Sequence, residues 1–207
     1  NSMPEFRTLA LSMGWPLPAD TGGRQRLAAL LSALGRRGPV DFLHLETKKT
    51  ARRHTENLPS ISNVDHQRLI PRSRRTKLVR WLVNRDPLLV CSYDFSGLIA
   101  SIRARSTQYD LLWAYGPIAA HVARLAAGAK TIVDFPDLPH EVQQQIDRSS
   151  PTGWLAASKH NFVMRVARAD VSRWRRFENL VERDCRVITV CSARERCCDD
   201  TSAMALM

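Results

Sequence analysis

The sequence predicts an α/β protein: a Rossmann-like parallel sheet with helices on both faces. Short apolar runs alternate with helix-like segments along the chain, which is the pattern of βαβ units. A strand, a helix and a second strand are complete between residues 6 and 46, and a crossover of that length favours parallel strands. With 44% hydrophobic residues among 207, the chain is able to bury a substantial core.

The first half of the chain is expected to begin with a strand at Phe6–Met13, an apolar run. A helix is expected at Arg24–Arg37, where leucines recur at helical spacing and glycines follow. Val40–Glu46 predicts the second strand, and the polar, aperiodic stretch Lys48–Ser60 predicts a loop. Shorter patterns then favour a strand at His66–Pro71 and helices at Ser73–Asn84 and Phe95–Arg105.

In the second half, the continuous apolar run Tyr109–Tyr115 predicts a buried strand. Pro117 stands where proline favours a helix start, and this helix is expected to end at Ala127, before Gly128. Further elements are a strand at Lys130–Phe135, a long helix at Lys159–Arg183 and a last strand at Cys185–Ser192. The apolar seam of the long helix is expected to consist of Phe162, Val166, Ala169, Phe177 and Leu180.

These elements predict a single domain over residues 6–192. Residues 1–5 are interpreted as a tag or a disordered segment, and residues 193–207 as an aberrant or truncated tail.

Positive charge is concentrated in one region. The formal net charge is +11, and thirteen Lys and Arg residues stand against four Asp and Glu residues between Arg36 and Arg85. Such a field attracts nucleic acid, anionic lipid or phosphorylated ligands, although a solvated basic surface explains it equally well.

The cysteine pattern favours a reducing compartment. Five cysteines form no C-x-x-C pair, and no suitably spaced ligand set for zinc is found. We therefore expect no metal site, and His44, His121 and His160 have no assigned partners.

Ligands of parallel α/β sheets bind beyond the carboxyl ends of the strands, and three motifs are expected there. In the first, Gly22 and Gly23 start a helix and Arg24 follows. Glycines let a phosphate approach the unpaired amides of a helix start, and arginine adds a charged contact. The spacing matches neither G-x-G-x-x-G nor a P-loop, so a flexible turn remains the alternative.

The second and third motifs follow the two central strands. Tyr115 and Gly116 end one strand, and Asp134 and Asp137 lie on the turn after the next. Asp137 is a candidate acceptor ligand or general base, whereas helix capping is the alternative for both acids. On the long helix, Arg173 and Trp174 are candidates for phosphate contact and sugar stacking, or they belong to an ordinary basic helix face.

Read in order, these motifs resemble the N-terminal, acceptor-side domain of GT-B fold, retaining nucleotide-sugar glycosyltransferases (glycosyltransferase family 4-like). The resemblance rests on "DTGGRQRL", "YDLLWAYGP", "TIVDFPDL", "RWRRFE" and "RVITVCS". It implies that Gly22, Gly23 and Arg24 approach donor phosphates. It also implies that Tyr115, Gly116, Asp134, Asp137, Arg173 and Trp174 serve the acceptor, with Asp137 as the catalytic candidate.

The resemblance further implies hexose transfer from a nucleotide-sugar to a glycan or lipid-linked acceptor, without a separate cofactor. It requires a C-terminal donor-binding domain as partner, so this chain by itself is expected to be inactive.

In view of this resemblance, we interpret the basic segment as a site of peripheral attachment to an anionic membrane. The expected contacts are Arg72, Arg74, Arg75, Lys77, Arg80 and Trp81. The expected location is cytoplasmic, at the inner face of the plasma membrane. The alternative function is a non-catalytic basic module that binds nucleic acid or another polyanion. Nucleic acid is disfavoured because Trp81 is the only aromatic residue from Leu43 to Leu89.

Overall fold

The structure is a computed structural model that describes residues 6–47, 58, 60–137, 139–140 and 154–190, with side chains of the last segment described from residue 169. The two termini expected at 1–5 and 193–207, and most of the loop expected at 48–60, lie outside the described residues.

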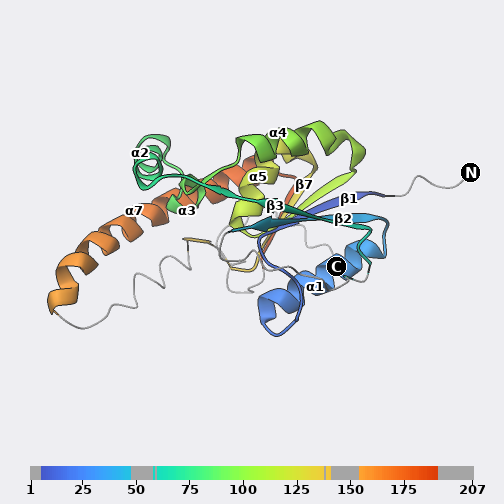
Figure 1. The fold of residues 1–207 in the computed structure, drawn as a ribbon, viewed down its shortest axis with the longest axis horizontal. Helices are drawn as coiled ribbons and strands as arrows, with labels where there is room; N and C mark the ends of the chain where they lie inside the picture. The colour runs from blue at the N-terminus through green and yellow to red at the C-terminus, as the bar shows by residue number, and fades with distance from the viewer. Residues whose placement is uncertain (1–5, 48–57, 59, 138, 141–153, 191–207) are drawn as a thin grey trace, which may run out of the picture.

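A six-stranded parallel sheet forms the centre of the molecule (Figure 1). The strand order is β3-β2-β1-β6-β7-β8, the doubly wound order in which the chain moves outward from the middle in both directions. Thr8 of β1 pairs with Val40 of β2 on one side and Leu111 of β6 on the other. The strands are β1 (Thr8–Ser12), β2 (Val40–Glu46), β3 (Asn63–Arg68), β6 (Leu111–Tyr115), β7 (Thr131–Phe135) and β8 (Val187–Val190); β4 (Ile70–Pro71) and β5 (Tyr93–Asp94) form a separate antiparallel pair.

Helices cover both faces of the sheet, as the sequence predicts. α1 lies on one face, and α4 and α5 lie on the other (Figure 1). The helices are α1 (Gly22–Gly35), α2 (Arg74–Asn84), α3 (Leu88–Cys91), α4 (Ser96–Arg105), α5 (Pro117–Ala127) and α7 (Trp154–Asp184), with short 3-10 turns at Ser106–Gln108 and Gly128–Lys130.

The two faces of the sheet build two hydrophobic clusters. On the α1 face, Leu27 and Leu31 pack against Phe42 and Trp113 of the sheet. The cluster on the opposite face is larger, and in it Leu9 and Leu11 of β1 pack with residues of α4, α5 and α7. Because β1 contributes to both clusters, all five of its residues are buried, and Leu9, Ala10 and Leu11 form an uninterrupted apolar run rather than an alternating pattern.

Local patterns place most elements within a few residues, with several differences. α1 begins at Gly22 rather than Arg24, so both glycines belong to the helix. The strand expected at His66–Pro71 is divided between β3, which begins earlier, at Asn63, and β4 of the separate antiparallel pair; the exposed polar residues of β3 carry no apolar pattern. The short helix α3 was not expected.

The predicted seam of α7 also needs correction. Among residues 169–184, whose side chains are described, the buried apolar residues are Trp174, Phe177 and Val181, whereas Ala169 and Leu180 are half-buried. Side chains at positions 162 and 166 lie outside the described residues. The seam turned toward the core therefore includes Trp174, which the sequence analysis assigned to ligand stacking.

Candidate functional site

The strands β1 and β6 are neighbours whose following segments lead to opposite sides of the sheet. Doubly wound sheets bind ligands at such a switch point, beyond the carboxyl ends of the strands. The segment after β1 leads into α1, and the segment after β6 leads into α5. Both predicted glycine motifs therefore lie at this edge of the sheet.

The start of α1 is open to solvent. Thr21 caps the helix by accepting a hydrogen bond from the backbone N of Arg24 at 3.4 Å. Gly22 and Gly23 are exposed, and a Cβ built on Gly22 would meet nothing within 4 Å. The Tyr115 hydroxyl donates to the Gly23 carbonyl oxygen at 2.9 Å, which fixes this helix start beside the end of β6.

Arg24 lies at the same helix start in an exposed ion pair. Its Nη1 atom is 2.9 Å from Asp20 Oδ1, and both side chains are more than 40% exposed. Exposed pairs of this kind contribute about 0–1 kcal/mol. The guanidinium is therefore able to exchange Asp20 for an anionic ligand at small cost.

The second helix start is formed by Gly116 and Pro117. Gly116 has φ +84° and is buried, and its backbone N donates to the Asp134 carbonyl oxygen at 2.9 Å. That backbone conformation favours glycine, whereas Pro117 occupies the first turn of α5. The sequence pattern "YGP" is thus explained by the turn geometry itself.

Asp134 differs from its expected role as an acceptor ligand. Its side chain is 1% exposed and is held by Arg26 at 2.7 and 3.0 Å and by the Thr189 hydroxyl at 2.8 Å. Both carboxylate oxygens are thereby occupied, and no surface remains for a ligand. Asp134 instead ties α1, β7 and β8 together.

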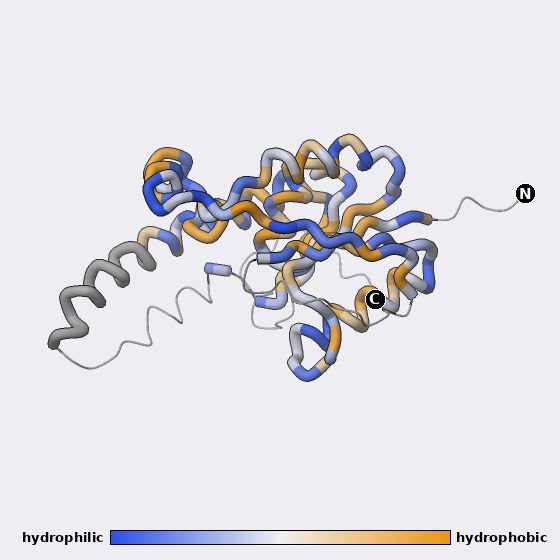
Figure 2. The backbone as a smooth tube through the Cα atoms, viewed as in Figure 1, coloured by the Kyte–Doolittle hydropathy of each residue, from blue (hydrophilic) through white to orange (hydrophobic). Residues whose placement is uncertain are grey.

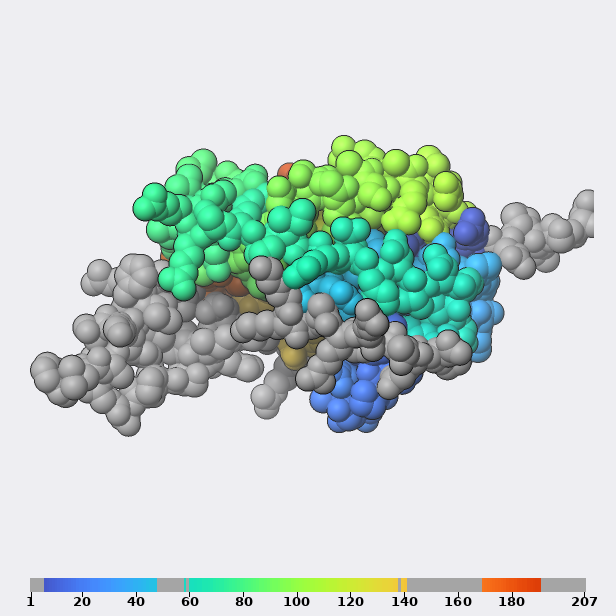
Figure 3. Space-filling view, viewed as in Figure 1, coloured from blue at the N-terminus to red at the C-terminus, as the bar shows by residue number. Residues whose placement is uncertain are grey.

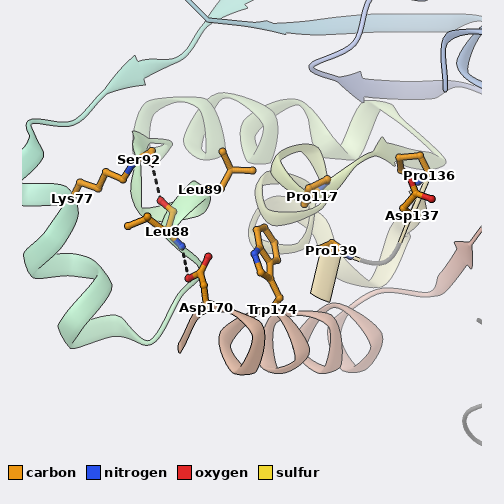
Figure 4. A pocket seen from close by; sticks show the side chains of 10 residues that line it. All are labelled: Lys77, Leu88, Leu89, Ser92, Pro117, Pro136, Asp137, Pro139, Asp170 and Trp174. Carbon is orange, nitrogen blue, oxygen red and sulfur yellow. Dashed lines mark hydrogen bonds between the residues drawn. The ribbon is translucent and has the colours of Figure 1, made fainter. Parts of the chain in front are cut away.

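A pocket of ≈ 450 Å³ lies at the same edge of the sheet but away from the start of α1, between α2, α3, α5 and α7 (Figure 4). The predicted residues Asp137 and Trp174 both line it, although they are 37 positions apart in the chain. Lys77 lines it as well. The walls are mainly apolar: Leu88, Leu89, Pro117, Pro136, Pro139 and Trp174, with Lys77, Ser92, Asp137 and Asp170 as the polar groups.

The turn that carries Asp137 is anchored to α7. The backbone N of His140 donates to Glu178 Oε1 at 3.0 Å, and its Nδ1 lies 2.6 Å from Glu178 Oε2. Asp137 itself is exposed. The pocket lining does not include Gly22, Gly23 or Arg24, so the phosphate motif and the pocket are separate places at one sheet edge.

Arg173 does not line the pocket. Its guanidinium lies over the ring of Trp81, 4.2 Å from the centroid, and donates to the carbonyl oxygens of Trp81 and Asp86. It therefore joins α7 to the end of α2, and the expectation that Arg173 reaches a ligand phosphate has no support from its contacts.

Asp170 is the pocket residue that the sequence analysis missed. It is 5% exposed, and its Oδ1 accepts hydrogen bonds from Trp81 Nε1 at 2.8 Å and from the backbone N of Leu88 at 2.9 Å. Burial raises the pKa of Asp170, while these two hydrogen bonds and the nearby Arg173 and Lys77 act against the rise. The available signal was its position four residues before Trp174, an acid on the buried seam.

Replacement of Asp170 with asparagine should change how stability depends on pH. The folded chain holds the Asp170 proton to higher pH than the unfolded chain does, because its pKa is raised. Its contribution is therefore present at low pH and is lost as pH rises from the unfolded pKa through the folded one. The amide oxygen of Asp170→Asn still accepts both hydrogen bonds. We therefore expect the free energy of unfolding of this variant to increase relative to that of the wild type as the pH rises. The gain should be no steeper than about 1.4 kcal/mol per pH unit. Urea unfolding from pH 4 to 8 measures it, and parallel profiles would contradict it.

The helix α2 projects from the body of the molecule (Figures 1 and 3). Two of its predicted membrane contacts face inward instead. Trp81 is 7% exposed and bound to Asp170, and Arg72, just before the helix, pairs with Asp94 at 2.9 Å. The prediction that Arg72 and Trp81 contact a membrane is therefore not supported by their positions.

Hydrophilic and hydrophobic residues are interspersed along α2 (Figure 2). Arg74, Arg75 and Arg80 are exposed, and Lys77 is half-buried. We call the exposed apolar residues of this helix the α2 stripe; its members are Leu78, Val79, Leu82 and Val83, which are 48–72% exposed. Large exposed apolar side chains gathered on one helix are typical of an interaction surface.

Compared with known proteins, the chain matches no family model, and no curated protein is significantly similar to it. Within the described residues, none of the helices has both the length and the apolar character needed to cross a membrane.

A further polar group lies at the carboxyl ends of β2 and β3. His44, Glu46 and His66 place one ligand atom each within 4.8 Å of one another. The cysteine spacing in the sequence predicted no metal site. The parallel register that sets His44 opposite His66 is not visible in a single strand.

Proposed function

We propose that this chain is the acceptor-side domain of a retaining nucleotide-sugar glycosyltransferase that works at a membrane surface. The observation that carries the proposal is the pocket at the carboxyl edge of a doubly wound sheet, which Asp137 and Trp174 both line. Proline, leucine and tryptophan walls with a few polar groups suit an amphipathic acceptor such as a lipid-linked glycan. Trp174, which is 5% exposed, contributes to the apolar pocket wall, and the exposed Asp137 offers a carboxylate for a sugar hydroxyl.

The donor phosphates are assigned to the start of α1. Its free backbone N–H groups carry the positive end of the helix dipole, and Gly22 and Gly23 leave them exposed. Arg24 supplies the charged contact. The nucleotide itself belongs to the partner domain that the resemblance implies, so the proposal for this chain is limited to acceptor and phosphate contacts.

The position of α2 supports the proposed membrane proximity. Lys77 lines the pocket from the same helix that carries the α2 stripe. A helix lying in the headgroup region would therefore bring the pocket mouth close to lipid-linked substrates.

The phosphate assignment is tested by Gly22→Asp, with Gly22→Ala as the matched control. Neither side chain meets an obstacle, and aspartate in the first turn should stabilise the helix by about 0.3–1 kcal/mol through its dipole. We expect inorganic pyrophosphate to shift the amide resonances of residues 22–24 in the wild type and in Gly22→Ala. Gly22→Asp should be at least as stable and should lose the shifts. A general folding defect cannot produce that combination.

Acceptor binding and the alternative function, binding of nucleic acid or another polyanion, are tested by separate experiments. Addition of a polyprenyl-phosphate sugar in detergent should perturb the indole resonance of Trp174 more than detergent alone. Equal perturbation by both, together with no response to pyrophosphate, would overturn the proposal. A salt-sensitive gel shift with random oligonucleotides would favour the polyanion-binding module instead.

A further inference from the structure

We propose that His44, Glu46 and His66 form a Zn²⁺-binding site. The three residues lie on neighbouring parallel strands, where His44 of β2 is the register partner of His66 of β3. Glu46 is two residues beyond His44, so both side chains point to the same face of the sheet. The fold therefore brings the three ligand groups together without any contribution from loops.

The distances between the ligand atoms match one face of a tetrahedral site. The Nδ1 atoms of His44 and His66 lie 3.3 Å apart. Glu46 Oε1 lies 2.9 Å from His66 Nδ1 and 3.5 Å from His44 Nδ1. Zinc bonds of about 2.0–2.2 Å at tetrahedral angles separate neighbouring ligand atoms by about 3.3 Å. An ion in the middle therefore needs only small adjustments.

The protonation of His44 also suits a ligand. Its Nε2 lies 3.2 Å from the Met13 carbonyl oxygen, which only accepts hydrogen bonds, so Nε2 carries the proton and Nδ1 offers its lone pair. Such a hydrogen bond from the remote ring nitrogen to a carbonyl is the usual support of a metal-binding histidine. A proton on His66 Nδ1 forms a hydrogen bond that links this atom to one of the other two ligand atoms. A cation placed between the three atoms contacts all of them.

Access and chemistry favour zinc over the hard cations. The His44 side chain is 1% exposed and that of Glu46 15%, while that of His66 is 35% exposed and opens the site to solvent. Two imidazoles and one carboxylate suit Zn²⁺, whereas Mg²⁺ and Ca²⁺ prefer oxygen ligands. Two histidines and a glutamate leave the fourth position for water.

The site connects to the segment that precedes α1. The ring of Trp15 stacks on His66 at 5.6 Å between centroids, and it meets His44 edge-on. Because Met13 and Trp15 both belong to the β1–α1 connection, bound zinc would hold that connection against the sheet. Since the chain has five tryptophans, a fluorescence change caused by Zn²⁺ is assigned to Trp15 by its loss in Trp15→Phe.

The test is calorimetric titration of chelator-treated protein with Zn²⁺, followed by the variants His66→Ala and Glu46→Gln. Asp65→Asn is the matched control, since this exposed β3 carboxylate is next to His66 and is not part of the cluster. We expect one ion per chain at the site, not displaced by excess Mg²⁺. Each ligand variant should weaken binding by more than about 100-fold, the upper range for losing even an indirect supporting group, and Asp65→Asn should leave it unchanged.

Two measurements on the wild-type protein test the site even if His66→Ala does not fold. Zinc X-ray absorption should show two imidazoles in a nitrogen and oxygen shell, without sulfur, and Zn²⁺ should change the fluorescence of Trp15. Absence of micromolar binding, a sulfur-containing shell, or binding that Glu46→Gln leaves unchanged would each overturn the site.

Discussion

Replacement of Arg26 with alanine should lower the free energy of unfolding by about 3 kcal/mol. Arg26 joins the Asp134 carboxylate through two hydrogen bonds of 2.7 and 3.0 Å, and the Asp134 side chain is 1% exposed. Removing one partner of a buried pair typically costs about 3–5 kcal/mol, because the remaining charge stays buried without its counter-ion. The lower end applies, since Arg26 is itself 28% exposed and Thr189 still donates to Asp134.

Arg24→Ala is the matched control for this experiment. The two arginines lie two residues apart on α1, and each pairs with an aspartate at a similar distance. Because the Arg24–Asp20 pair is exposed, its loss should cost less than about 1 kcal/mol. Urea unfolding at neutral pH measures both. Equal effects of the two substitutions would mean that burial of Asp134 does not control the energetics of this pair.

Two aspartates in the α2 stripe should largely abolish binding to anionic vesicles. Leu82 and Val83 are 61% and 72% exposed, so most of their apolar surface is available to enter a membrane interface. Full burial of such side chains is worth about 1.5–3 kcal/mol each. The double substitution Leu82→Asp and Val83→Asp should therefore reduce vesicle partitioning by at least about 30-fold.

Leu125→Asp is the control, because Leu125 is an exposed leucine, 37% accessible, on α5 rather than α2. Vesicle sedimentation at low salt gives the readout. Wild-type protein should prefer anionic over neutral vesicles by on the order of 100-fold, since Arg74, Arg75 and Arg80 are exposed and each cation contributes about 1 kcal/mol. Equal binding to both vesicle types, or equal losses from the α5 and α2 substitutions, would remove the membrane assignment.

The sequence by itself determined the α/β class and most element positions. The helix Pro117–Ala127 has the bounds that proline and glycine punctuation predicted, and the run Leu111–Tyr115 is buried as its continuous apolar character predicted. Such signals are local, because helical and strand periodicities repeat within a few residues. The polar edge strand Asn63–Arg68 shows the limit, since backbone pairing with one neighbour leaves little pattern in its side chains.

Only the tertiary structure decided which candidate residues meet. Asp137 and Trp174 line the same pocket, Asp134 turns inward to Arg26, and Trp81 is buried against Asp170 rather than exposed on α2. Strand order and register bring His44 to His66, although the sequence alone indicated no partner for His44. Contacts of this kind depend on how distant segments are placed against one another, and local periodicity carries no information about that placement.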